Sequence, residues 1–465
     1  RSPAPRGKSQ AKIVKSYGPW LLVLLVGLGC GPGAETDGGQ TASGTAVDPQ
    51  PARHGRVPVG ELVLGTWLPA GLDRYRFSAQ DQVLLAGLGL NQIEWLQRGE
   101  FDGETAEARA MDFCRAHGLQ MPVFYEPPGF TPHDKLQNWA TRSFLGAGFA
   151  DSVGLRVQAL KTRWAGAEGF QGYLVGHEDY AAEYYEALAG VVDAIGRVDS
   201  LRPVLTVGRI DHYVDGEAFA AAFFREGGQP NIFQHEHYVF RGNVPTEGSG
   251  LQSKLSFLLA GYGQVAEYLQ GRWGRWHAVV QVQSEKRVDK VYYRKPSAAE
   301  ISVQAGLALS RGASGIIYFL YSSGVEEFRN AKGEWVQTRY YEGLVGRDGM
   351  PTKSYGAVQA LNRQLQALSP VLAQLYFYGA GALENELLFG TDEDIALGLF
   401  GNRERQTHVL VVNRRTWQKR TVTLTVKGQA VVDVATGEIL PMVNDQVQVA
   451  LAAGGFRLLA VARDN

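Results

Sequence analysis

Short apolar runs alternate with amphipathic helical stretches throughout residues 59–344, and this alternation repeats eight times. Residues 180–197 and 298–311 are two of the helical stretches. A helix between successive strands is typical of parallel sheets, because a parallel pair needs a long crossover connection. The candidate strands cover residues 62–67, 90–95, 121–125, 170–175, 203–207, 231–235, 277–283 and 315–320.

Eight strand–helix units in about 285 residues match the usual size of a closed (β/α)8 barrel. An open doubly wound sheet is the alternative. It is disfavoured because no Gly-rich phosphate-binding fingerprint follows the first candidate strand. The sequence therefore predicts an α/β fold with a (β/α)8 barrel over residues 58–370.

The chain of 465 residues is too long for one ordinary domain. After a predicted helix over residues 355–368, the pattern changes to short alternating strands separated by turn residues. We therefore expect a small all-β sandwich over residues 371–465. Its candidate strands are residues 395–400, 407–412, 420–426, 430–434, 446–451 and 456–461.

The N-terminal residues are of a different kind. Basic residues precede an apolar run over residues 20–28, which has the length of a secretory signal rather than of a membrane-spanning helix. The run ends at Cys30 and resembles a bacterial lipobox, which implies lipidation of Cys30. A plain signal peptide with an incidental cysteine is the alternative. Residues 1–30 are thus a predicted signal, and residues 31–57 a predicted flexible tether without a core.

Composition excludes several classes of partner. The formal net charge is -1, so no basic excess exists to bind nucleic acid. Cys30 and Cys114 are the only cysteines, which excludes a disulfide framework, and Cys114 is expected to be a buried thiol. His235 and His237 would face one side of a strand, but no third metal ligand follows at a recognisable spacing. We expect neither a metal nor a cofactor.

Barrel active sites lie at the carboxyl ends of the strands. Polar and aromatic residues occur at the ends of the candidate strands, and we expect them to converge on one mouth. These residues are Trp67, Glu94, Glu126, His177, Glu178, His235, His237, Tyr238, Glu285 and Tyr321.

Four segments carry a resemblance to a known family. Residues 170–179 (FQGYLVGHED) and 295–323 (KPSAAEISVQAGLALSRGASGIIYFLYSS) resemble bacterial barrel proteins related to the large clan of retaining glycoside hydrolases. So do residues 343–365 and the sandwich residues 407–440. The resemblance implies a carbohydrate substrate, a general acid/base after the fourth strand and a nucleophile after the seventh. These positions correspond to Glu178 and Glu285. The clan has asparagine before the acid/base, whereas this chain has His177.

The residue types suit this chemistry. Retaining hydrolysis needs one carboxylic acid that protonates the leaving oxygen and one carboxylate that attacks the anomeric carbon. The other mouth residues would bind the sugar. The resemblance thus implies hydrolysis of glycosidic bonds in an oligo- or polysaccharide at the cell surface. A non-catalytic glycan-binding or scaffolding barrel is the alternative, in which Glu178 starts a helix and Glu285 forms a surface ion pair with Lys286 or Arg287. The oligomeric state stays open.

The lipobox resemblance can be tested by fractionation. If Cys30 is lipidated, the protein should be exported, stay in the cell envelope and sediment with membranes, and Cys30→Ser should release it. The membrane would then be a partner only through the lipid. Cys114→Ser, which changes the other cysteine, is the control and should remain with membranes. Soluble wild-type protein would contradict the prediction.

Overall fold

The computed structural model of the chain describes residues 57–68, 78–95, 103–124, 149–177, 182–226, 228–288, 290–329, 335–380, 388–389 and 394–462. The predicted signal, Cys30 and almost all of the predicted tether lie outside these residues. Among the described helices, none is long and apolar enough to cross a membrane.

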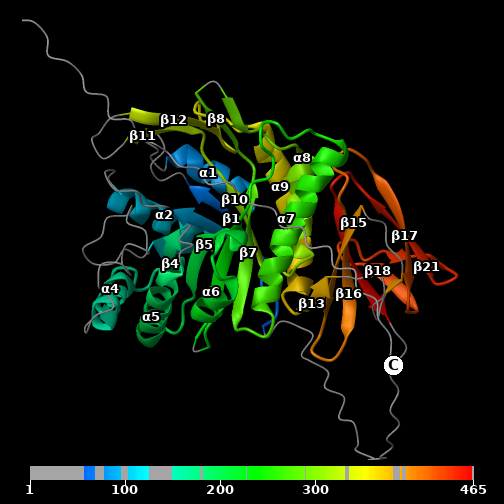
Figure 1. Ribbon diagram of the computed structural model, residues 1–465, viewed down its shortest axis with the longest axis horizontal. Helices are drawn as coiled ribbons and strands as arrows, with labels where there is room; N and C mark the ends of the chain where they lie inside the picture. Colours follow the sequence, from blue (N-terminus) through cyan, green and yellow to red (C-terminus); the bar gives the residue numbers. More distant parts are fainter. Residues whose placement is uncertain are drawn as a thin grey trace, which may run out of the picture. The chain divides into compact units, whose positions relative to one another are not determined.

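Parallel strands form a closed barrel, as the alternating pattern predicts (Figure 1). The sheet has eight strands in the order β2-β1-β10-β7-β6-β5-β4-β3. The Ile93 N–H donates to Gln120 O at 2.9 Å and the Gln120 N–H donates to Asn91 O at 2.8 Å, which joins β2 to the start of β3. The strands are β1 (Val63–Leu68), β2 (Gln92–Trp95), β3 (Met121–Phe124), β4 (Phe170–His177), β5 (Val204–Gly208), β6 (Asn231–Glu236), β7 (Gly274–Gln281) and β10 (Gly315–Phe319).

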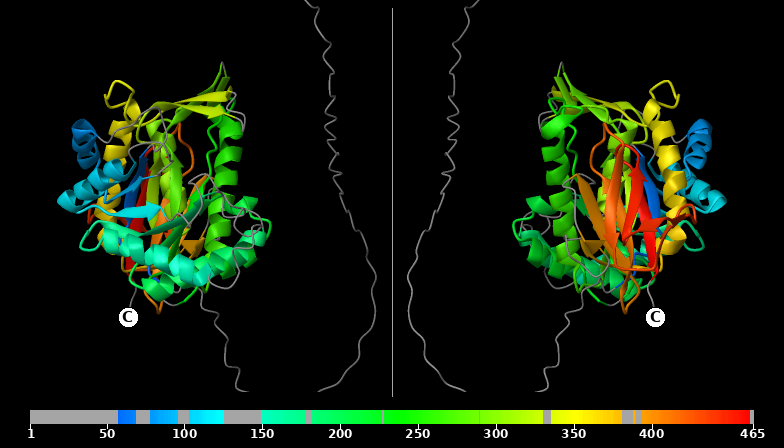
Figure 2. Two further views of the ribbon diagram at one scale, coloured as in Figure 1. Left: turned by 90° about the vertical axis from the view of Figure 1, so that its left-hand side faces the viewer. Right: turned by 90° about the vertical axis from the view of Figure 1, so that its right-hand side faces the viewer.

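Helices cover the outside of the barrel (Figures 1 and 2). Ser78 and Ser297 begin two of them with capping boxes, in which a side chain three residues on bonds back to the cap. Cys114 is fully buried, as expected. The helices are α1 (Ala79–Gly87), α2 (Gly103–His117), α4 (Phe149–Arg163), α5 (Glu183–Val198), η1 (Ile210–His212), α6 (Gly216–Phe223), α7 (Gly248–Leu269), α8 (Ala298–Leu309) and α9 (Lys353–Leu372).

A second, antiparallel sheet was not predicted. Its order is β11-β12-β8-β9, and its strands belong to the connections that follow β7 and β10. We call it the mouth sheet, because it continues from the carboxyl ends of two barrel strands. The bounds are β8 (Ser284–Arg287), β9 (Lys290–Tyr293), β11 (Gly324–Arg329) and β12 (Trp335–Glu342).

The C-terminal residues form the predicted β-sandwich. Ile395, Leu397 and Val409 of one sheet share a buried cluster with Val422 and Val449 of the other. One sheet contains β13 (Tyr376–Ala380), β15 (Ile395–Gly401), β16 (Gln406–Asn413), β22 (Phe456–Ala462), β18 (Ala430–Asp433) and β19 (Ile439–Leu440). The other contains β14 (Leu388–Phe389), β17 (Arg420–Val426), β21 (Gln446–Leu451) and β20 (Met442–Val443).

Helix α8 links the barrel to the sandwich. It is buried on nearly all sides, which suits its almost entirely apolar sequence. Val412 and Phe456 of the sandwich belong to the same buried cluster as the barrel helices. The close approach depends on Gly306, where an added Cβ would lie 2.8 Å from a ring atom of Phe456 and 2.9 Å from a methyl group of Val412. The predicted domain boundary between residues 370 and 371 stays a prediction.

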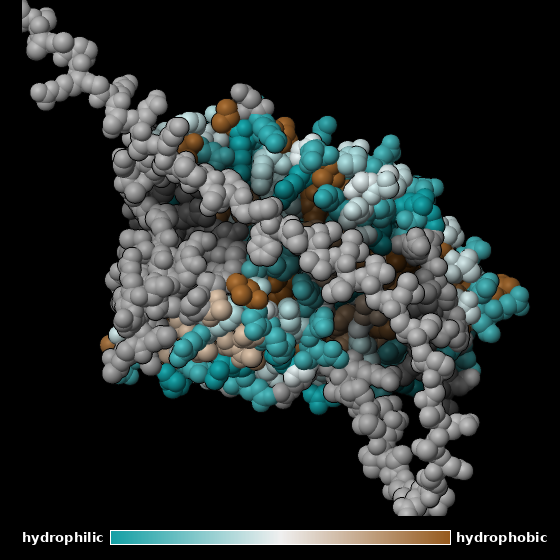
Figure 3. All heavy atoms as spheres, viewed as in Figure 1, coloured by the Kyte–Doolittle hydropathy of each residue, from teal (hydrophilic) through white to brown (hydrophobic). Residues whose placement is uncertain are grey.

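The part of the surface that is coloured in Figure 3 is mostly hydrophilic, with separate apolar residues among the polar ones. The large exposed apolar residues include Val83, Leu155 and Leu201, which lie on three different segments of the barrel. Scattered exposed side chains of this kind are ordinary on a soluble domain.

Two helix glycines offer a matched test of the packing at α8. Gly306→Ala should lower the free energy of unfolding by about 1–3 kcal/mol, because the new methyl group overpacks the contact with the sandwich. Gly196→Ala in α5 meets nothing within 4 Å and should raise it by about 0.5–1 kcal/mol. Urea denaturation measures both. Equal stability gains in the two variants would contradict the tight contact at Gly306.

Candidate active site

Glu94 lies inside the barrel, in the layer below the mouth. Its strand, β2, stands opposite β6, four strands away in either direction round the barrel. The Gln234 Nε2 of β6 donates to Glu94 Oε1 at 2.5 Å, so this hydrogen bond crosses the interior. The Gln92 Nε2 donates to the same oxygen at 2.6 Å. Glu94 Oε2 is buried and has no hydrogen-bond partner among the described residues.

The protonation of Glu94 is set by its burial. The side chain is fully buried, and the resulting loss of solvation raises the pKa of Glu94 to about 7. The hydrogen bonds from Gln234 and Gln92 act in the opposite direction but are weaker. Near neutrality, Glu94 is therefore divided between a carboxylic acid and a carboxylate, the state that proton transfer and hydrogen-bond donation require.

Aromatic side chains form one wall above this layer. Trp67 at the end of β1 meets the Phe319 ring edge-on, with centroids 6.0 Å apart. Tyr238 stacks on Phe319 at 5.4 Å and meets Tyr293 of the mouth sheet at 5.8 Å. Trp67 is almost fully buried, whereas Tyr238 is half-buried. Two residues named from the sequence thus converge here, with Tyr238 nearer to the opening.

Glu236 is a further carboxylate at the mouth that the sequence reading did not select as a site residue. It is the last residue of β6 and lies two residues beyond Gln234, so both point to the barrel interior. The Tyr238 hydroxyl donates to Glu236 Oε2 at 3.4 Å. The sequence does place an acidic residue at the end of the sixth strand. The prediction selected the histidines on either side of it instead.

Glu285 lies in β8 of the mouth sheet and is almost fully buried. Its Oε1 contacts the Arg287 Nε, and the Arg339 Nε of the neighbouring strand lies 3.7 Å from the same oxygen. No described residue forms a hydrogen bond or ion pair with Oε2. The Tyr341 hydroxyl donates to Glu326 Oε2 at 3.2 Å, and Tyr341 packs against the apolar cluster inside the barrel that contains Trp67. The face of the sheet that carries Glu285 therefore turns toward the mouth.

His235 and His237 lie on the outer side of the barrel wall. Both point to α7, where an added Cβ on Gly261 would lie 3.2 Å from His235 Nε2 and 3.4 Å from His237 Nδ1. The Ile210 N–H donates to His235 Nδ1 at 3.2 Å. Burial lowers the pKa of His235 to about 3 and that of His237 to about 4, so both are neutral at physiological pH. The pair shares one face, as expected, but it faces a helix rather than the mouth.

Tyr321 also points away from the mouth. Its hydroxyl lies 3.2 Å from Asp81 Oδ1 at the start of α1. Burial and the Asp81 carboxylate raise the pKa of Tyr321. Among the described residues, no group of three His, Cys, Asp or Glu side chains could hold a metal ion.

Three predicted site residues lie partly or wholly outside the residues that the structure describes. The backbone of His177 ends β4 and pairs with Val207 of β5, but its side chain is not among those described. Glu126 and Glu178 lie outside the described residues. The structure thus brings Trp67, Tyr238 and Glu285 to the mouth and Glu94 to the layer beneath it. In the sequence, Glu178 directly follows the end of β4.

The raised pKa of Glu94 makes stability depend on pH. Between the ordinary pKa of 4.5 and the folded value of about 7, the folded state holds a proton that the unfolded state has released. The free energy of unfolding should therefore fall as pH rises through this window, by up to about 3 kcal/mol, and level off above it. Glu94→Gln keeps the acceptor oxygen and should remove this loss.

Urea denaturation at pH 5, 6, 7 and 8 measures this effect. Glu94→Gln should become more stable relative to the wild type as pH rises. Glu61→Gln, at an exposed position before β1, should follow the wild-type profile. Parallel curves for Glu94→Gln and the wild type would show that Glu94 is ionised throughout.

Comparisons with known proteins relate the chain to others by fold alone. No protein-family model matches it, and no curated protein matches it in sequence. A β-galactosidase from Bacillus circulans sp. alkalophilus matches with a TM-score of 0.58 and 8% identity, over 88% of this chain and 100% of that one. A family 39 glycoside hydrolase from Bacteroides cellulosilyticus WH2 matches with a TM-score of 0.45 and 12% identity, over 87% and 81%. The β-galactosidase match agrees with the predicted (β/α)8 barrel fold.

Proposed function

We propose that this chain hydrolyses glycosidic bonds of an oligo- or polysaccharide at the carboxyl-terminal mouth of its barrel, with retention of configuration. The observation that carries the proposal is the position of Glu285. It comes directly after the seventh barrel strand, on the face of the mouth sheet that turns inward, with one carboxylate oxygen engaged and the other without a described partner.

In the proposed reaction, Glu178 protonates the leaving glycosidic oxygen while Glu285 Oε2 attacks the anomeric carbon. Water then hydrolyses the glycosyl–enzyme ester, and Glu178 takes up the proton of that water. Arg287 and Arg339 both contact Oε1. These contacts would hold the carboxylate group and fix the direction of Oε2.

The remaining mouth residues would bind the sugar. Tyr238 and Trp67 supply an aromatic wall, on which the apolar face of a sugar ring can stack. Glu94 and Glu236 supply carboxyl oxygens from opposite sides of the barrel, which can bond to hydroxyl groups. Glu126 and His177 are proposed as further contacts because they follow the third strand and end the fourth. With lipidation at Cys30, the reaction would occur at the cell surface.

A non-catalytic glycan-binding barrel is the second candidate. The same contacts at Glu285 favour it, because a carboxylate held by two arginines can also be purely structural. The two functions differ in what the loss of Glu285 does. An enzyme loses turnover and keeps substrate binding, whereas a binding protein has no turnover to lose.

The discriminating experiment replaces Glu285 and a matched residue on the same sheet. Purified wild-type protein is screened for hydrolysis of a panel of aryl glycosides. Glu285→Ala should lower kcat on any active substrate by more than about a thousandfold, because the nucleophile is lost. Glu327→Ala, an exposed neighbour of Glu326 on β11, is the control and should retain activity within about twofold.

Azide and the leaving group separate the two carboxylate roles. With Glu285→Ala, azide should form a glycosyl azide of inverted configuration, because it attacks the face that the carboxylate vacated. Glu178→Ala should spare substrates with good leaving groups and slow those with poor ones. Full activity of Glu285→Ala would end the proposed mechanism. Glycan binding without turnover in the wild type would favour the binding protein.

A further inference from the structure

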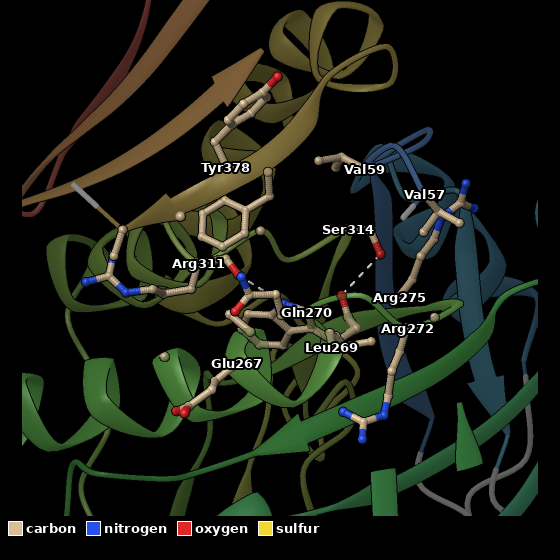
Figure 4. Close-up of a pocket in the computed structure, with 18 of the residues that line it drawn as sticks. Val57, Val59, Glu267, Leu269, Gln270, Arg272, Arg275, Arg311, Ser314 and Tyr378 are labelled. Atoms are coloured by element: carbon tan, nitrogen blue, oxygen red, sulfur yellow. Dashed lines mark hydrogen bonds between the residues drawn. The ribbon is translucent and has the colours of Figure 1, made fainter. Parts of the chain in front are cut away.

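A second concave site lies at the opposite end of the barrel from the mouth (Figure 4). It is a cavity of about 240 Å³ at the start of β7, lined also by the last turns of α7 and by β13 of the sandwich. Val57 and Val59, which precede β1, complete its wall. Residues of the barrel and the sandwich thus enclose it together.

Arg275 of β7 has no described partner in this cavity. Figure 4 shows its side chain extending toward Val57. The Arg275 Nε is buried without a hydrogen-bond partner, and no described carboxylate forms an ion pair with the guanidinium group. Burial lowers the pKa of Arg275, which indicates that the cation is not fully solvated either.

The position of this guanidinium depends on a glycine. An added Cβ on Gly60 would lie 2.8 Å from Arg275 Cζ and 2.8 Å from its Nη2. Gly60 also has a φ of +81°, which a side chain would strain. The backbone therefore provides a flat surface beneath one face of the guanidinium group.

Arg311 adds positive charge on another wall of the cavity. Its Nη1 donates to Ser310 O at 2.9 Å and to Leu397 O at 3.0 Å, which are neutral acceptors. Burial lowers the pKa of Arg311 to about 10. Arg272 differs from both, because it contacts Glu217 and donates to Tyr268 O at 2.7 Å. Glu267 is exposed at the rim. The charges of Arg275 and Arg311 thus have no ion pair with any described acidic side chain, whereas that of Arg272 does.

The rest of the wall is apolar or already hydrogen-bonded. Phe377, Val57 and Val59 offer carbon surfaces, and Trp276 uses its indole N–H on Arg311 O at 3.2 Å. The Ser314 hydroxyl donates to Trp276 O at 3.1 Å. Arg275 is half-buried, so its cation loses part of its solvation without gaining a counter-ion. A planar guanidinium pairs best with a carboxylate through two parallel hydrogen bonds. The carbon surfaces would accept an apolar group attached to that carboxylate.

We propose that this cavity binds a small carboxylate with an aromatic or apolar body. The carboxylate would lie on the Arg275 guanidinium group, and the body would lie against Phe377. The site is separate from the mouth, because Arg275 starts the strand whose other end leads to Glu285. It does not depend on the proposed hydrolysis.

Calorimetric titration of the full chain with benzoate tests the proposal. Benzoate is expected to bind saturably, with one molecule per chain. Benzyl alcohol, which has a ring but no carboxylate, and inorganic phosphate should both bind much more weakly. Arg275→Met keeps an apolar stem and should weaken benzoate binding by about tenfold or more. Arg272→Met is the matched control, because it removes a nearby arginine that already has an ion-pair partner. Its affinity for benzoate should stay within about twofold of that of the wild type.

Arg275→Lys keeps the charge without the planar fork and should bind benzoate more weakly than the wild type, which provides a test if Arg275→Met does not fold. Absence of saturable benzoate binding, or equal binding by the Arg275 variants, would overturn the proposal. Phosphate binding without benzoate binding would reduce the site to one for inorganic anions. Equal binding of benzyl alcohol would show that the guanidinium group is not used.

Discussion

Closure of the parallel sheet between β2 and β3 is the constraint on which the rest of the structure depends. The hydrogen bonds of Gln120 with Asn91 and Ile93 complete the ring of strands. Because the strands of this ring are all parallel, they start at one end and finish at the other. The polar residues that finish strands must therefore meet at a single mouth, and residues that start strands, such as Arg275, must lie at the opposite end.

The closed interior also changes the chemistry of what it contains. Gln92, Glu94 and Gln234 occupy positions that apolar side chains usually fill in a barrel. Burial removes the favourable solvation of these polar groups, and the hydrogen bonds to Glu94 Oε1 only partly offset that loss. The pKa of Glu94 is raised because its charged form loses the most solvation. The layer beneath the mouth is thus less stable than an apolar one would be, and it provides a titratable group near neutrality.

The barrel strands and the sandwich could be predicted because each buried strand carries a short, continuous or alternating apolar pattern. The mouth sheet could not, because β8 reads Ser-Glu-Lys-Arg and β11 carries two glutamates, which are typical of loops. Side-chain direction was the other limit. The sequence places His235 and His237 on one face, but whether that face is the interior or the helix layer depends on register, and a one-residue shift reverses it. The same limit separates Glu236, which points inward, from the histidines beside it.

Arginines at the two ends of the barrel have different surroundings. At the mouth, Arg287 of β8 and Arg339 of β12 both lie within ion-pair distance of the Glu285 carboxylate. At the start of β7, Arg275 has backbone beneath it and carbon around it, but no described anion. Partial burial of a cation without a counter-ion costs stability. The difference in pairing, rather than the presence of a cavity, is therefore what distinguishes the proposed ligand site from the mouth, where the arginines contact a carboxylate.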